Sequence, residues 1–178
     1  MQTVFFDIEA GGLKAPFDQV ICCAFKPYKK RAYVISRHAG DTSDKELCED
    51  IRNEMEKYDH LVSYYGVGYD KAFISARLLK HKLKPLRRQL HTDCYRIAKR
   101  LFRWTMQSLR LVTICEHLDI EGKTRVKPAL WEDFKYDALD GKERALKEIC
   151  NHCKWDVITL ERAWDKCFKY EVVSISLR

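Results

Sequence analysis

Glycine and proline are scarce in this sequence, with seven and four among 178 residues. That scarcity excludes collagen-like and low-complexity chains, and a hydrophobic content of 46% predicts an ordinary globular protein. No apolar run approaches the roughly 20 residues that a membrane-spanning helix needs. No basic start is followed by an apolar run and a small-residue cleavage site. We therefore expect a soluble, intracellular protein of the cytoplasm that makes no membrane contact.

The length suits one domain with one sizeable core, residues 1–178. Eight cysteines could form a disulfide framework, but such frameworks belong to small secreted chains, and a secretion signal is missing. Cys22, Cys23 and Cys115 lie in apolar runs, where a free cysteine behaves as a small hydrophobic residue. The sequence therefore predicts reduced thiols.

The net charge of +7 is concentrated in one segment. Residues 77–110 contain eleven Lys or Arg and one acid, Asp93, whereas the rest of the chain has a small acidic excess. A concentrated basic segment is typical of proteins that bind nucleic acid. A solvated helix face is the alternative interpretation.

Alternating or β-branched apolar residues predict five strands. Three of them open the chain as an antiparallel set, Thr3 to Glu9, Gln19 to Lys26 and Arg31 to Ser36. Two shorter strands follow, His60 to Tyr64 and one near Leu90. Strands first, then strands alternating with helices, favour an α/β fold with a mixed sheet flanked by helices.

Helices are predicted from apolar residues at helical spacing. The first follows the candidate N-caps Asp41, Thr42 and Ser43 and has Leu47, Ile51 and Met55 on its core face. The second covers 70–80 and has Phe73, Ile74, Leu78 and Leu79 on its core face. Three more are predicted, a basic helix over 94–102, a helix from Gln107 or Ser108 to Leu118, and a long helical region within 131–170.

Two acids share one face of the first strand. Asp7 and Glu9 are two residues apart, so their side chains point to the same side of an otherwise apolar strand. Burying unpaired charges is costly, and a divalent cation with oxygen ligands would offset that cost. A solvated strand end, or pairing with basic side chains, is the alternative.

Two more acids lie in later segments. Asp70 follows a glycine-bearing turn and opens a helix, where Asp is usually an N-cap. Asp156 lies in the long helical region, and His152 is one turn earlier on the same helical face. A His–Asp pair at this spacing is more often a surface or supporting pair than a catalytic one. Each acidic motif is a modest signal alone, and the order and spacing of the motifs along the chain are the specific feature.

The strand motif DIE, the helix-opening motif YYGVGYD and the late helical motif HCKWD resemble, in this order, the three motifs of DEDD (DnaQ-like) 3′–5′ exonucleases. Within that superfamily the chain is most similar to the ribonuclease H-like group typified by the bacterial YprB domain. The second motif of the family often carries Asn where Tyr65 stands. The third places its base as Tyr four residues or His five residues before the Asp, whereas His152 is four before Asp156.

The resemblance implies a ribonuclease H-like mixed sheet and a 3′–5′ exonuclease that acts on DNA or RNA. Two divalent ions roughly 3.5–4 Å apart can activate water and stabilise a leaving oxygen, and all-oxygen ligands suit Mg²⁺ or Mn²⁺. A structure-selective endonuclease on the same fold and a non-catalytic nucleic-acid-binding module are the alternatives. The implied metal ligands are Asp7, Glu9, Asp70 and Asp156, with His152 as general base.

The basic segment also supplies candidates for contacts to a single-stranded 3′ end, where cations hold phosphates and rings stack on bases. Trp104 could instead pack in the core. Asp93 could approach the metal site, but a structural role at its turn is favoured. A CNHC motif at 150–153 does not predict zinc, because no second paired motif accompanies it. The candidates are Lys99, Arg100, Arg103, Trp104 and Arg110, with Lys123, Arg125 and Lys127 as a second group.

Overall fold

The computed structural model describes residues 1–121 and 128–171 and contains a five-stranded sheet with the order β3-β2-β1-β4-β5. β1 pairs with β2 and β2 with β3 in antiparallel fashion, whereas β1, β4 and β5 run parallel. The predicted mixed α/β sheet is therefore confirmed. The strands are β1 (Thr3–Ala10), β2 (Val20–Pro27), β3 (Tyr33–Ser36), β4 (His60–Ser63) and β5 (Leu90–Asp93).

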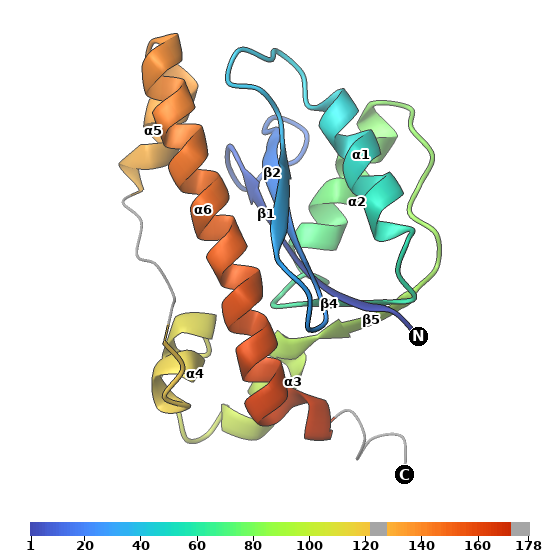
Figure 1. Ribbon diagram of the computed structural model, residues 1–178, viewed down its shortest axis with the longest axis vertical. Coiled ribbons are helices and arrows are strands. Elements are labelled where there is room, and N and C mark those ends of the chain that lie inside the picture. The colour runs from blue at the N-terminus through green and yellow to red at the C-terminus, as the bar shows by residue number, and fades with distance from the viewer. Residues whose placement is uncertain (122–127, 172–178) are drawn as a thin grey trace.

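Helices cover both faces of this sheet (Figure 1). The long helix α6 (Leu139–Ala163) crosses one face and packs on β1 and β2. α1 (Lys45–Met55) and α2 (Asp70–Lys80) lie on the opposite face. α5 (Ala129–Tyr136) packs against α6, and α4 (Leu111–His117) contacts α6 nearer its C-terminal end. α3 (Cys94–Phe102) directly follows β5, and a π-helical turn over 164–168 continues α6.

Strand alternation divides the core in two. Along β1, Val4, Phe6 and Ile8 pack with α1 and α2, whereas Phe5 packs with α6. β2 is buried along its whole length because helices cover both of its faces. All eight cysteines lie in the described residues and none forms a disulfide, as predicted. Since side chains alternate along a strand, the acids at 7 and 9 share the Phe5 side and face α6.

Two helix boundaries differ from the prediction. α4 begins at Leu111 instead of Gln107 or Ser108, because Arg110 is extended and its amide donates to the Ser108 hydroxyl at 3.3 Å. A serine that bonds locally to the backbone competes with helix formation. The long helical region is divided into α5 and α6, because residues 137 and 138 adopt extended backbone.

The start of α1 also differs. The residue at its N-cap is Asp44, and the candidates Asp41, Thr42 and Ser43 precede it. The carboxylate of Asp44 makes no capping hydrogen bond and is fully buried. The sequence predicted the cap one to three residues earlier, and long-range contacts decide the role of the Asp44 side chain.

The outer surfaces of the helices are largely polar. Leu79, predicted for the core face of α2, is 69% exposed, whereas Phe73, Ile74 and Leu78 are buried as predicted. Within residues 1–121 and 128–171, none of the helices combines the length and the apolarity that crossing a membrane requires.

Candidate active site

The first strand presents Asp7 and Glu9 near the end of its pairing with β2. Glu9 is opposite Cys22, and the register of the two strands shifts between Glu9 and Ala10. Such an irregularity bends a strand locally and redirects its side chains, and it is common next to active sites. Both acids are partly buried, so two negative charges lie where the sheet meets α6.

Helix α6 brings His152 and Asp156 to these acids. The Nε2 atom of His152 is 3.9 Å from Oε1 of Glu9 and 3.9 Å from Oδ2 of Asp156. The neighbouring thiol of Cys153 donates to the backbone oxygen of Asp7 at 3.3 Å and lies 3.5 Å from its Oδ2. The four-residue spacing along α6 thus places the imidazole between an acid of the strand and an acid of the helix.

Asp70 reaches the same region from α2. Its Oδ1 accepts a 3.0 Å hydrogen bond from the backbone amide of Ile8, the residue between the two strand acids. The alternative of a simple N-cap is wrong, because Tyr69 holds that position and the Asp70 carboxylate bonds to β1 instead. Burial, together with the negative charges of Asp93 and Asp156, raises the pKa of Asp70 to about 7. The surroundings therefore disfavour its charged form unless a cation is present.

The four acids fit a hard divalent cation by their chemistry, since all of them offer carboxylate oxygens. Within the part of the chain that the structure describes, only Asp44, Cys48 and His81 bring three ligand atoms within 4.8 Å of one another. The four acids therefore form no closed three-ligand shell in this conformation. Mg²⁺ usually binds through one or two carboxylates and completes its coordination with water and substrate phosphates, and this open arrangement is compatible with that mode.

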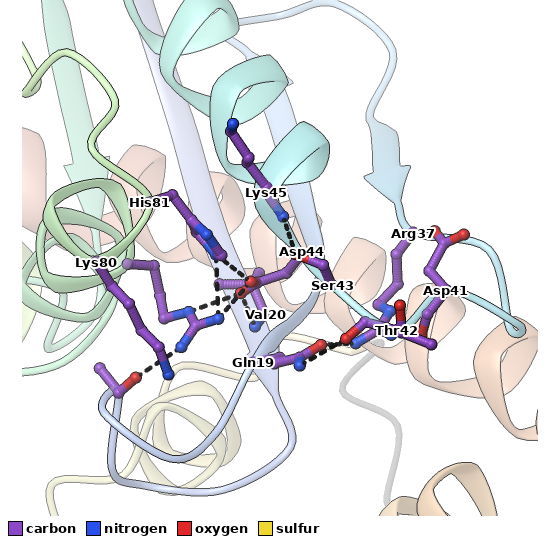
Figure 2. Close-up of polar contacts among 12 residues, drawn as sticks. Gln19, Val20, Arg37, Asp41, Thr42, Ser43, Asp44, Lys45, Lys80 and His81 are labelled. Carbon is purple, nitrogen blue, oxygen red and sulfur yellow. Dashed lines mark hydrogen bonds and ion pairs between the residues drawn. The ribbon is translucent and has the colours of Figure 1, made fainter.

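The Asp44 group contains a buried ion pair. The guanidinium of Arg77 binds both oxygens of Asp44, Nε to Oδ2 at 2.9 Å and Nη2 to Oδ1 at 2.5 Å. The Nε2 atom of His81 lies 2.7 Å from Oδ1 (Figure 2). Burial acts to raise the pKa of this carboxyl, but the hydrogen bonds from Arg77 and His81 lower it below its ordinary value. Because Arg77 already supplies the positive charge, we interpret this group as structural rather than as a metal site.

The same region fixes the loop that follows the strand acids. Arg77 is 1% exposed, so it adds nothing to the surface charge of the basic segment in which the sequence placed it. Three side chains of α2 and its N-cap donate to carbonyl oxygens of the loop, Arg77 to Ala15 at 3.0 Å, Lys80 to Pro16 at 2.7 Å and Tyr69 to Gly12 at 3.0 Å.

A cleft of about 610 Å³ opens beside the acids. That volume lies within the usual range for ligand sites. Two of the acids, one cation and three tyrosine rings therefore share one space. The lining residues are Asp7, Tyr64, Tyr65, Tyr95, Leu109, Arg110, Leu111, Val112 and Asp156.

Of the five residues predicted to bind nucleic acid, Arg110 lines this cleft. Lys99 is exposed on α3, and the Nη2 atom of Arg100 is 2.6 Å from Oε2 of Glu171. The remaining predicted residues, Arg103 and Trp104, form a cation–π pair at 4.6 Å.

Trp104 is 85% exposed, so the alternative that it packs in the core is wrong. The second predicted group, Lys123, Arg125 and Lys127, lies outside the described residues.

Sequence reasoning missed the aromatic neighbour of His152. The ring of Trp131, on α5, lies 6.3 Å from the ring of His152 at an interplanar angle of 88°. Helical periodicity placed Trp131 at the start of a helix but gave no sign of its partner.

Asp93 has the structural role that the sequence favoured, because its carboxylate accepts hydrogen bonds from the backbone amides of Tyr65, Val67 and Tyr95.

A family model described as the RNase H superfamily matches residues 4–167. The chain therefore belongs to the RNase H superfamily. No curated protein matches it in sequence. Among solved structures, it is similar to the family B DNA polymerase from the hyperthermophilic archaeon Pyrobaculum calidifontis, with a TM-score of 0.70 and 16% identity over 92% of this chain. The likeness is one of fold, and the chain covers 24% of that polymerase.

Membership of this superfamily supports a nuclease activity in general, with nucleic acid as the ligand and divalent metal ions as cofactors. The fold is widespread among solved structures, of which 326 chains match it. A given fold hosts many activities, so the side chains of the site must carry any finer assignment.

Proposed function

We propose that the chain is a metal-dependent 3′–5′ exonuclease that removes nucleotides from single-stranded ends of DNA or RNA with two divalent ions, Mg²⁺ or Mn²⁺. The observation that carries the proposal is the approach of four acids, from β1, α2 and α6, to one end of the central strand. The Asp70–Ile8 hydrogen bond and the position of His152 between Glu9 and Asp156 support it.

When bound, the two cations supply Lewis-acid activation of water and stabilise the leaving oxygen of the phosphodiester. Asp7, Glu9, Asp70 and Asp156 hold them. The rigid strand fixes the first two acids, and the amide of Ile8 orients the third. Four carboxylates from three separate segments therefore converge with little freedom to move apart.

His152 accepts the proton of the attacking water, because an imidazole titrates near neutral pH. Arg110, on the wall of the cleft, binds a phosphate of the substrate strand. In this arrangement the acidic end of the cleft holds the scissile phosphate, and the basic end holds the rest of the strand.

The test is digestion of end-labelled single- and double-stranded DNA and RNA with Mg²⁺, with Mn²⁺ and with chelator. We expect mononucleotides to be released from 3′ ends only when a metal is present. Asp7→Ala and Asp156→Ala should abolish cleavage and keep the fold, since each removes one of several mutually repelling charges. Asp50→Ala, an exposed acid on α1, is the matched control and should leave cleavage unchanged. Full activity in excess chelator would overturn the two-metal mechanism.

Circular single strands and strands with blocked 3′ ends distinguish the alternatives. Cleavage of a circle would show a structure-selective endonuclease, because an exonuclease needs a free end. Binding without cleavage under every metal condition would show a non-catalytic nucleic-acid-binding module.

A further inference from the structure

Tyr65 has a left-handed backbone conformation, with a φ of 67°, in the turn between β4 and α2. Residues other than glycine rarely adopt this conformation, and Asn and Asp tolerate it better than a bulky aromatic residue does. Strained residues of this kind persist when their surroundings hold them, and they cluster at ligand-binding sites. The conformation of Tyr65 thus requires both a structural cause and a reason for the aromatic ring.

The structural cause is Asp93, at the end of β5. Its buried carboxylate accepts hydrogen bonds from the amide of Tyr65 at 2.8 Å and from the amide of Val67 at 3.1 Å. Gly68 completes the support, because a Cβ atom there would lie 2.8 Å from the Cζ atom of the Tyr65 ring. The ring can rest on this glycine only because Gly68 has no side chain.

The ring of Tyr65 meets a second ring on the wall of the cleft. Tyr65 and Tyr95 have ring centroids 5.0 Å apart and an interplanar angle of 85°. Asp93 also accepts from the amide of Tyr95 at 3.1 Å, so one carboxylate positions the backbone of both tyrosines. Tyr65 remains 51% exposed although it is so firmly held. Two rings at right angles form a corner, and a planar group that stacks on one of them meets the other edge-on.

The cation of the cleft is positioned by the same turn. The hydroxyl of Tyr64 donates to the carbonyl oxygen of Leu109 at 2.5 Å, which fixes the chain directly before Arg110. Tyr64, Tyr65, Tyr95 and Arg110 line the same cleft as two of the acids. Two aromatic rings at right angles and one cation, next to the candidate metal site, are complementary to the base and the phosphate of a nucleotide.

We propose that Tyr65 and Tyr95 form a nucleobase-binding corner that holds an unstacked base of the single-stranded substrate, while Arg110 binds a phosphate of the same strand. The inference rests on the proposed function and specifies its substrate. Aromatic rings stack on every base, so the corner selects single strands over duplexes without reading sequence. A base inside a duplex is already stacked on its neighbours and cannot enter the corner.

The decisive variant is Tyr65→Asn, because Asn tolerates a positive φ better and removes the ring. We expect the melting temperature to stay equal or to rise, while binding of a single-stranded oligonucleotide weakens by roughly 5- to 150-fold, as the loss of one stacked base predicts. In kinetics, KM should rise more than kcat falls. Tyr65→Phe keeps the ring and should bind within about twofold of the wild type, since stacking needs the ring alone. Tyr136→Asn, an aromatic residue on α5 that is 79% exposed, is the control outside the cleft and should change nothing.

A spectroscopic measurement separates stacking from a general loss of shape. Oligonucleotides with 2-aminopurine at successive positions from the 3′ end are bound to the Asp156→Asn variant, which should not digest them. We expect fluorescence quenching to be strongest at one position, and expect Tyr65→Asn in the same background to remove that quenching while the other positions keep theirs. Unchanged affinity and unchanged quenching in Tyr65→Asn would overturn the inference.

The inference and the proposed function fail in different ways. The wild type could cleave normally from the 3′ end while the Tyr65→Asn variant binds and quenches as the wild type does. That result would overturn the nucleobase-binding corner and leave the exonuclease proposal standing. Position-specific quenching that depends on Tyr65, without any metal-dependent cleavage, would support the corner and remove the exonuclease. A lower melting temperature with proportional losses in kcat and binding would assign Tyr65 a purely structural role and so overturn the inference.

Discussion

The backbone amide of Ile8 donates a 3.0 Å hydrogen bond to the carboxylate of Asp70, which joins the central strand to the first turn of α2. Because Ile8 lies between the two strand acids, this one bond sets the position of the third acid relative to the first two. The carboxylate is buried, and its pKa is raised to about 7. Burial therefore shifts the titration of Asp70 from the acidic range toward neutral pH.

Metal affinity should depend on this titration. A raised pKa means that protons compete with the cation below neutral pH, so Mg²⁺ affinity should fall as the pH drops through about 7. We expect roughly tenfold weaker binding at about pH 6 than at about pH 8 for an ion that needs the charged form of Asp70. Titration calorimetry at the two pH values measures the difference.

The Asp70→Asn variant provides the comparison for that measurement. An Asn side chain can still accept from the Ile8 amide, so the fold should be kept while the pH dependence disappears. Equal affinity of the wild type at both pH values would contradict a role for Asp70 in holding the metal.

His152→Ala should slow turnover by roughly 10²- to 10⁴-fold and leave metal and substrate binding intact, because a general base acts only in the chemical step. The acidic limb of the pH–rate profile should lose one inflection. Asn151→Ala, an exposed neighbour on α6, is the matched control. His152→Tyr should retain part of the activity if a tyrosine at this spacing serves the same purpose. Normal turnover in His152→Ala would leave His152 as a packing partner of Trp131.

Replacing Lys99, Arg100 and Arg103 with Ala should weaken nucleic-acid binding and flatten its dependence on salt. The magnitude of the slope of log K against log salt should decrease by about 2 for a single strand, since the loss of three phosphate contacts means that fewer counterions are released on binding. Binding isotherms at several salt concentrations give this slope. The exposed residues Arg144, Lys147 and Lys154 on α6 provide a triple variant with the same loss of charge. Equal effects of the two triple variants would show that only net charge matters.

Asp44→Asn should destabilise the fold by about 3–5 kcal/mol, because it leaves the guanidinium of Arg77 buried without a charged partner. The pKa of Asp44 is lowered in the folded state. Its contribution to stability is therefore present above the unfolded value of about 4 and is lost as the pH falls through the folded value. Urea unfolding at neutral and acidic pH should show the two proteins approaching each other in stability at low pH. Asp50→Asn, exposed on the same helix, should unfold as the wild type does.

Local periodicity was enough to predict much of the fold and part of the site. A period of two puts Asp7 and Glu9 on one side of a strand, and a period of 3.6 puts His152 and Asp156 on one side of a helix. Both relationships depend only on residues a few positions apart. The roles of these four residues are still predictions, since their geometry does not test catalysis.

Contacts between distant segments could not be predicted in this way. Asp44 stands directly before a helix, as a capping residue does, yet it bonds to Arg77 33 residues later. Arg77 lies in a basic segment and gave no sign of its burial. The positive φ of Tyr65 depends on Asp93, 28 residues away. In each case the partner is brought close by the packing of separate elements, α1 on α2 or β5 beside β4, which local sequence does not specify.

The strand acids are far in sequence from the part of α6 that they contact. Asp7 and Cys153, which share a hydrogen bond, are 146 residues apart. During synthesis the ribosome releases β1, β2 and β3 long before α6 exists. The site can therefore assemble only after α6 has been made and has packed on the sheet. A chain truncated before α6 would carry three of the four candidate acids, Asp7, Glu9 and Asp70, and would lack Asp156 and His152, so the proposed activity is withheld until α6 has been translated.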